Sequence, residues 1–233
     1  MKINRILQIL MIITIPFILL MGSVRLLISP NFAKFEYYRS WFPDDPYGMS
    51  KDERLKWSRC AINYLVNDEE ITYLSDLRFD DGEAVFLERE LDHMVDVKKV
   101  VKTTLAVWYG LLGFLFASAI WFLVMGGKKY LKQALDWGGW LTVGLIVAVL
   151  IMVIVSFNQL FEWFHKLFFE DGTWIFYQDD TLIRLFPLEF WRDAFVFVSV
   201  LTVLFAGVIL LIGFICRKRL SKRKNSEKKP ETV

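Results

Sequence analysis

The sequence contains only two histidines, His93 and His165, and they are the side chains best suited to chemistry in this chain. The ordinary pKa of an imidazole lies close to neutral pH, so a histidine can both accept and return a proton there. Two histidines in one site of low dielectric could therefore act as general base and general acid. Each could equally be a hydrogen-bonded packing residue, and the sequence leaves that interpretation open.

Other catalytic patterns are weak or missing. Glu90 and Asp96 lie about one helical turn from His93, but a zinc site needs a further ligand and no His-Glu-x-x-His sequence occurs. There is no Gly-x-Ser-x-Gly sequence and no glycine-rich phosphate loop. Cys60 lies within an amphipathic pattern, where a packing role is expected. If the protein is an enzyme, its substrate is expected to supply the nucleophile while the histidines move protons.

Four long apolar stretches determine how the histidines are positioned. Hydrophobic residues make up 55% of the 233 residues and the mean hydropathy is +0.38, which is typical of a membrane protein. A stretch of about 20 apolar residues can cross the bilayer as a helix. We predict a mainly α fold of four transmembrane helices with an extracellular cap that contains amphipathic helices and short strands. The predicted spans are 6–28, 104–125, 139–160 and 194–216.

Charged residues outside these spans predict their orientation. The loop 126–138 and the tail 217–233 are basic, whereas segment 31–103 carries 11 basic and 16 acidic side chains and segment 161–193 carries 3 and 7. Basic residues favour the cytoplasmic side of a membrane. Both termini are therefore expected in the cytoplasm, and the two acidic segments, each with one histidine, are expected outside.

The outer segment 31–103 is too long for a simple connector and is expected to fold as a cap. Ser50-Lys51-Asp52-Glu53 is a capping-box sequence, and the apolar spacing after it predicts an amphipathic helix that ends near Asn67. A short extended piece is expected over 71–79, and a second helix is expected to begin near Ala84 and lead toward the second span.

Aromatic residues make up 16% of the chain, and many of them lie in the outer segments. Their density at 161–169 and 186–191 is typical of the aromatic belts that anchor a protein at the membrane interface. The alternative is that some of these rings line an apolar pocket above the bilayer.

Two stretches around the histidines carry a family resemblance. The first reads Arg-Glu-Leu-Asp-His-Met-Val-Asp-Val-Lys over 89–98 and leads into the second span. The second comprises Phe164-His165-Lys166-Leu167-Phe168-Phe169, then Trp174, Asp180-Thr181-Leu182-Ile183 and Pro187. With Tyr47-Gly48-Met49-Ser50 and the four-span layout, the chain resembles the bacterial lipoprotein intramolecular transacylases, formerly an uncharacterised integral membrane protein family, over nearly its whole length.

The resemblance implies an acyltransferase. Such enzymes move the sn-2 acyl chain of a diacylglyceryl lipoprotein onto the free amino group of its N-terminal cysteine, giving a lyso-form lipoprotein. The substrate amine attacks the ester of its own molecule, so no enzyme nucleophile, metal or cofactor is expected. The expected partners are the diacylated lipoprotein and membrane lipids, without nucleic acid. The expected location is the bacterial plasma membrane, with the active site at the outer leaflet interface.

The resemblance also implies that His93 and His165 are the catalytic pair. One would remove a proton from the amine, and the other would stabilise the oxyanion or protonate the leaving oxygen. Of the two, His93 is favoured as the base.

Further residues are expected to bind the substrate or support the pair. Arg89 would bind a carbonyl oxygen or pair with Asp92 or Glu90, and Asp96 and Asp180 would orient His93 and His165 respectively. An aromatic wall would hold the folded-back head of the substrate. The rings expected in this wall are those of Trp41, Phe164 and Trp174.

Two other functions remain open from the sequence. The chain could be a non-catalytic membrane scaffold whose cap binds another protein, in which case replacing either histidine would leave lipoprotein processing unchanged. It could also be a metal-assisted hydrolase, which chelators would inactivate.

Overall fold

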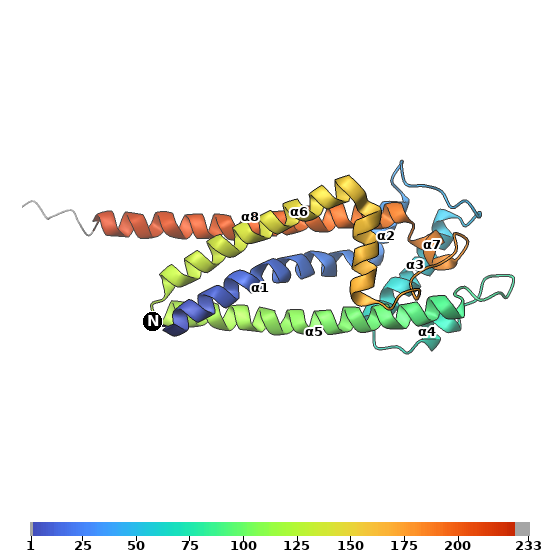
Figure 1. Cartoon of the computed structure of the whole chain (residues 1–233), viewed down its shortest axis with the longest axis horizontal. Helices are drawn as coiled ribbons and strands as arrows, with labels where there is room; N and C mark the ends of the chain where they lie inside the picture. Colours follow the sequence, from blue (N-terminus) through green and yellow to red (C-terminus); the bar gives the residue numbers. More distant parts are fainter. Residues whose placement is uncertain (1, 227–233) are drawn as a thin grey trace, which may run out of the picture. The chain divides into compact units, whose positions relative to one another are not determined.

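The computed structural model describes the backbone of residues 2–226 and the side chains of residues 2–215. Within this range the structure is helical, and an isolated bridge between Arg78 and Ala84 is its only β pairing. The predicted mainly α fold is therefore confirmed, whereas the side chains of the predicted basic tail, 217–233, lie outside the described residues. In chain order (Figure 1), the helices are α1 (Lys2–Leu27), α2 (Pro30–Tyr37), α3 (Lys51–Val66), α4 (Thr72–Ser75), α5 (Glu88–Val124), α6 (Lys128–Phe168), α7 (Thr181–Leu185) and α8 (Leu188–Ser226).

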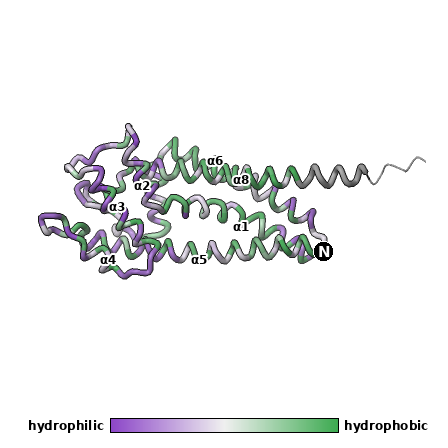
Figure 2. Tube along the Cα trace, turned by 180° about the vertical axis from the view of Figure 1, so that it is seen from behind, coloured by the Kyte–Doolittle hydropathy of each residue, from purple (hydrophilic) through white to green (hydrophobic). Residues whose placement is uncertain are grey.

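Four of these helices are long and apolar enough to cross a membrane. They are α1, α5, α6 and the Leu188–Ile215 part of α8. Hydrophobic residues cover most of the length of these helices, whereas the segments that connect α1 to α5 and α6 to α8 are largely hydrophilic (Figure 2). The chain is therefore a multi-pass membrane protein, as its composition predicted.

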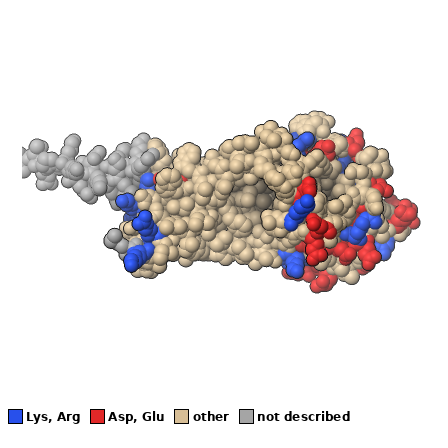
Figure 3. Space-filling model, viewed as in Figure 1, with Lys and Arg blue, Asp and Glu red and all other residues tan. Residues whose placement is uncertain are grey.

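The chain divides into two compact units. The first, here called the span unit, comprises Met1–Ser23, Trp108–Leu150 and Ser199–Val233. The second, the cap unit, comprises Val24–Val107 and Ile151–Val198, and it contains both histidines. Acidic side chains gather on the surface of the cap unit (Figure 3).

Helices of the span unit pack closely where small residues face large ones. A Cβ atom at Gly138 on α6 would lie 2.6 Å from Cδ1 of Ile15 on α1, so only glycine permits this approach. The buried Thr202 hydroxyl donates to the Ser23 hydroxyl over 2.9 Å, which joins α8 to α1. Small residues and side-chain hydrogen bonds are the usual means by which helices associate in lipid.

The first cap helix, α3, forms where its sequence predicted. The Ser50 hydroxyl accepts the Glu53 N–H, the Glu53 carboxylate accepts the Ser50 N–H, and Asn67 ends the helix. Trp57, Ala61 and Tyr64 on one face of α3 are buried in the main core of the cap unit. This face explains why the helix is amphipathic.

The extended piece expected over 71–79 forms only at its end, where 77–79 pairs with 83–85 through the bridge between Arg78 and Ala84. Thr72–Ser75 forms the single turn α4, which turns Leu74 into the core, where it is 0% exposed. The second cap helix also begins later than Ala84, at Glu88. Its start is determined by the Glu90 carboxylate, which accepts the Leu87 N–H over 2.8 Å in the manner of a capping box.

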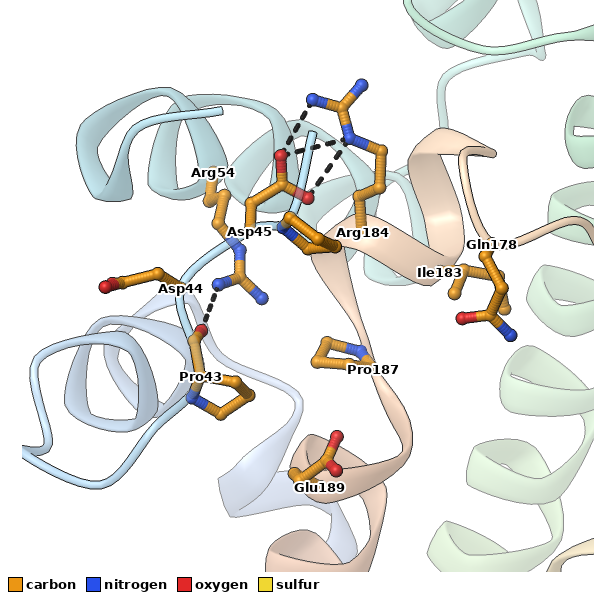
Figure 4. A pocket seen from close by; sticks show the side chains of 10 residues that line it. Pro43, Asp44, Asp45, Arg54, Gln178, Ile183, Arg184, Pro187 and Glu189 are labelled. Atoms are coloured by element: carbon orange, nitrogen blue, oxygen red, sulfur yellow. Dashed lines mark hydrogen bonds and ion pairs between the residues drawn. The ribbon is translucent and has the colours of Figure 1, made fainter. Parts of the chain in front are cut away.

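Two polar contacts join distant parts of the cap unit. The buried Asp45 carboxylate pairs with the Arg184 guanidinium on α7 at 2.9 Å and also accepts the Met49 N–H. Figure 4 shows the paired side chains beside a cavity of about 180 Å³. On α5, the Lys98 ammonium group donates to the Glu69 carbonyl and, over 3.1 Å, to the Asn67 amide oxygen. These contacts attach α7 and the end of α3 to the rest of the cap unit.

Candidate active site

The two histidines lie on different helices of the cap unit. His93 is in the second turn of α5, among the charged residues that precede its apolar part. His165 is near the end of α6, beyond Ser156, where the backbone leaves the helical region with φ −160° and ψ 83°. After this break the end of α6 runs across toward the first turns of α5 (Figure 1). Both histidines lie outside the predicted spans, 104–125 and 139–160.

The imidazole rings of His93 and His165 face each other. Their centroids are 6.3 Å apart, and the ring planes differ by 20°. The side chains are 9% and 8% exposed, so both are buried. The two imidazoles therefore lie in one buried site, where a single substrate head could contact both.

Aromatic rings surround the pair. Phe169 and Phe176 contact His93 with centroid distances of 5.0 and 5.3 Å. His165 contacts Phe161 at 4.1 Å and Trp174 at 4.8 Å, and Phe164 meets it edge-on at 5.5 Å. These rings replace water around both imidazoles, which lowers the local dielectric and strengthens any hydrogen bond to a reacting group.

A backbone hydrogen bond determines the tautomer of His165. Its Nδ1 lies 2.8 Å from the Phe161 carbonyl oxygen, which can only accept. We therefore assign the proton of the neutral ring to Nδ1, which leaves the lone pair on Nε2. His93 differs, because its Nδ1 is buried without a hydrogen-bond partner among the described residues.

Burial also determines the charge state of the pair. It lowers the pKa of His93 to about 4, with a smaller contribution from the neighbouring His165. Burial lowers the pKa of His165 as well, and the hydrogen bond to the Phe161 carbonyl opposes that shift. Both imidazoles are therefore largely neutral at pH 7.

Arg89 does not pair with Asp92 or Glu90, as the sequence suggested, but with Asp180. The guanidinium Nε donates to the Asp180 carboxylate over 3.0 Å, and Nη2 also contacts it. Asp180 further accepts the Tyr177 N–H over 2.9 Å. Burial raises the pKa of Asp180, but the bonds from Arg89 and Tyr177 outweigh it, and the pKa lies below its ordinary value.

Asp180 therefore has a different contact from the one expected. It does not orient His165, whose Nδ1 is bound to a carbonyl group, but it fixes the loop that precedes α7. That loop carries Trp174 and Phe176, the two rings that lie against the histidines. Through this loop, the Arg89–Asp180 pair supports the wall of the site.

Two of the predicted supporting residues lie apart from the histidines. Asp96 is exposed and makes no hydrogen bond to His93. Trp41 is 68% exposed and contacts the Arg39 guanidinium, 4.3 Å from the ring centroid. Of the three rings expected in the aromatic wall, Phe164 and Trp174 contact His165, and Trp41 contacts neither histidine.

Four residues of the site were not predicted from the sequence. Phe161, Phe169 and Phe176 are ring contacts that the aromatic composition alone does not distinguish from interface anchors. Glu90 is 0% exposed and accepts the Leu182 N–H over 2.6 Å, which joins α5 to α7. A glutamate in the first turn of a long helix is usually solvated. Only the hydrogen bond from the Leu182 N–H therefore shows that Glu90 joins α5 to α7.

Among the side chains that the structure describes, no three His, Cys, Asp or Glu residues are grouped as metal ligands would be. The arrangement offers instead one imidazole with a free lone pair and a second imidazole facing it. Such a site can transfer a proton and stabilise a developing negative charge.

A family model and one curated relative match most of this chain. The model of the lipoprotein intramolecular transacylase Lit matches residues 9–191. An uncharacterized protein of Aquifex aeolicus (strain VF5) is 32% identical over 219 residues, which cover 93% of this chain and 97% of the relative.

Solved structures share the fold. The in meso structure of the membrane integral lipoprotein intramolecular transacylase Lit from Bacillus cereus superposes with a TM-score of 0.76. The identity is 21%, and the match covers 97% of this chain and 99% of the other. Two structures of the same protein, each with one histidine replaced, give TM-scores of 0.71 and 0.72 at 21% identity. They cover 97% and 94% of this chain, and 96% of the other chain in each case.

The two-histidine composition allows the ring protonation to be tested by NMR. In purified protein labelled with ¹⁵N-histidine, we expect His165 to carry its proton on Nδ1 and to titrate below 6.5, while His93 titrates near 4. In denaturant both midpoints should return to about 6.5. His93→Gln and His165→Gln assign the signals. A folded-state midpoint at or above 6.5, or an Nε2–H tautomer of His165, would contradict this description.

Proposed function

The chain belongs to the lipoprotein intramolecular transacylase family, and we propose that it moves the sn-2 acyl chain of a diacylglyceryl lipoprotein onto the free amino group of the N-terminal cysteine. The product would be a lyso-form lipoprotein. The observation that carries this proposal is the facing pair of buried imidazoles, 6.3 Å apart and walled by aromatic rings.

The reaction needs no nucleophile from the protein. The amine and the ester belong to one substrate molecule, so the protein has mainly to hold them in reacting geometry and move protons. Phe164 and Trp174, which both contact His165, are suited to confine the folded-back glyceryl head while the acyl chains remain in the bilayer.

We assign the general base to His165, which is opposite to the assignment that the sequence favoured. Its Nδ1–H is bound by the Phe161 carbonyl, so its Nε2 lone pair is available. When Nε2 accepts a proton, the carbonyl oxygen also stabilises the imidazolium that forms. His93 has no such partner, and burial makes its imidazolium costly.

His93 would then act as a neutral hydrogen-bond donor. A neutral imidazole of low pKa can donate its N–H to an oxyanion without becoming protonated first. In the aromatic surroundings, such a bond to the tetrahedral intermediate is stronger than it would be in water.

The proposed steps balance without any co-reactant. The neutral amine attacks the ester carbonyl, a C–N bond forms and His93 donates to the oxyanion. His165 Nε2 takes one proton from the attached nitrogen. The intermediate then collapses, the bond from the carbonyl carbon to the sn-2 oxygen breaks, and the His165 imidazolium returns its proton to that oxygen. The products are an amide and a free sn-2 hydroxyl group.

We further propose that the protein lies in the bacterial plasma membrane with both termini in the cytoplasm and the histidine site at the outer leaflet. The basic loop 126–138 and the acidic segments 31–103 and 161–193 support this orientation.

Removing either imidazole should abolish most of the transfer. With a synthetic diacylglyceryl lipopeptide in liposomes, we expect His93→Ala and His165→Ala to slow transfer about 10²- to 10⁴-fold, the usual contribution of acid–base groups. Mass spectrometry should show an unchanged total mass with one chain moved to the amine by the wild type. Leu167→Ala, at a 76% exposed position beside the site, is the matched control and should keep full activity.

The glutamine variants separate the two roles within the same assay. Glutamine can donate an N–H but cannot take a proton, so His93→Gln should keep more activity than His93→Ala, whereas His165→Gln should be as inactive as His165→Ala. The reverse pattern would restore His93 as the base. A folded wild type that moves no chain would refute the transacylase proposal and favour the scaffold alternative, and loss of activity with a chelator would favour the metal-assisted hydrolase.

The rate should rise with pH through neutrality. The substrate amine has an ordinary pKa of about 7.7–8.0, so the neutral fraction and kcat/KM should increase about tenfold per unit below pH 7. His165 must also be neutral, so the slope of log kcat/KM against pH should steepen toward two once the pH falls below the lowered pKa of His165. Protonation of His93 should lower the rate further near pH 4. Initial rates from pH 4 to 9 measure this, and a rate that is constant below pH 6.5 would contradict it.

Orientation can be tested in intact spheroplasts. A protease site inserted in the exposed turn at Asp81–Gly82 should be cleaved from outside, whereas a C-terminal tag should stay intact until the membrane is permeabilised. Cleavage of the tag in intact spheroplasts would reverse the proposed orientation.

A further inference from the structure

The span unit contains a groove that the proposed reaction does not use. It lies between α1 and the first turns of α6 and has a volume of about 880 Å³. That volume is within the range of pockets that bind small molecules. All of its lining residues belong to the span unit, so none of them is shared with the histidine site.

One end of the groove is polar. Arg5 and Gln8 line it from the first turns of α1, and Tyr130 and Gln133 line it from the first turns of α6. The Gln8 Nε2 donates to the Gln133 Oε1 over 3.2 Å, which joins the two helices at this end. The hydrogen-bonding groups of four side chains are thus gathered in one place.

The other end of the groove is apolar. Ile9 and Ile12 continue along α1, while Trp137 and Trp140 continue along α6. The two indoles are 64% and 62% exposed and extend the apolar surface of the two isoleucines. The groove is therefore amphipathic along its length.

The charge at the polar end is positive. No acidic side chain lines the groove, and Arg5 forms no ion pair with another side chain that the structure describes. The nearby Asp136 is already paired with Lys132 at 2.7 Å. Lys128 and Lys129 are exposed just before Tyr130, and basic side chains gather where α6 begins (Figure 3).

We infer that this groove binds an anionic glycerophospholipid from the leaflet next to the loop 126–138. The phosphate group would contact Arg5, with the Gln133 amide and the Tyr130 hydroxyl as further partners, and one acyl chain would run along Trp137 and Trp140. Two other ligands fit the groove less well. A soluble anion would contact only the polar end, and a hydrocarbon would leave Arg5 without a counter-charge. Basic pockets between membrane helices bind anionic lipid headgroups for the same reasons.

Native mass spectrometry of the full chain in mild detergent tests this inference. The probes are phosphatidylglycerol and phosphatidylcholine with identical palmitoyl and oleoyl chains. We expect the wild type to retain one phosphatidylglycerol in preference to phosphatidylcholine. Arg5→Gln should weaken retention about fivefold, the effect of one basic side chain, and Arg5→Lys should restore most of it. Ile9→Trp, which fills the groove without a change of charge, should also weaken retention.

Two controls separate the groove from general attraction to the basic surface. Lys129→Gln removes a nearby charge that does not line the groove and should leave retention unchanged, and soluble glycerol phosphate should not compete. Three outcomes would each indicate annular lipid only and overturn the inference. They are equal retention of both lipids, equal losses with Arg5→Gln and Lys129→Gln, and full retention by Ile9→Trp. Competition by glycerol phosphate would reassign the site to a free phosphate. Transacylation by Arg5→Gln should be unchanged. Loss of lipid binding at the groove can therefore be distinguished from failure of the proposed transacylation.

Discussion

The buried carboxylate of Glu90 ties the start of α5 to the start of α7, and the histidine site depends on that connection. Its two oxygens accept the Leu87 N–H at 2.8 Å and the Leu182 N–H at 2.6 Å. A buried carboxyl group without partners is costly, so these two hydrogen bonds hold the start of α5 and the start of α7 together. The adjacent Arg89 binds Asp180, which fixes the loop before α7.

The second requirement is the break in α6 at Ser156. If α6 continued straight through Ser156, its last turns would carry His165 along the axis of α6 and not toward α5. The break lets the last turns of α6 cross to α5 within the cap unit, where His165 meets His93 at 6.3 Å. The Phe161 carbonyl, one turn before His165, then fixes the ring through its Nδ1. The same short segment thus supplies both the base and the group that orients it.

The aromatic surroundings connect this geometry to the proposed chemistry. Rings on both sides of the pair exclude water, which keeps both imidazoles neutral and makes a hydrogen bond to an oxyanion effective. The amine and the ester arrive joined in one substrate, so the site has to supply orientation and proton transfer rather than a nucleophile. The groove of the span unit has the opposite character, because its polar end is positive and has no acidic lining, which suits a permanent anion.

The sequence alone predicted four long apolar helices and the capping box that starts α3, because these depend on hydropathy and on residues three apart. Its composition also singled out the two histidines as candidates for chemistry. The sequence could not determine what each side chain meets. Asp180 is 91 residues from Arg89 and Leu182 is 92 from Glu90, and contacts at such separations arise only from folding. The extended piece expected over 71–79 is confined to 77–79 for the same reason, since Leu74 enters the core by a helical turn. Only the tertiary structure decided that the two imidazoles meet, because they lie on different helices and their approach depends on the direction of α6 after the break at Ser156.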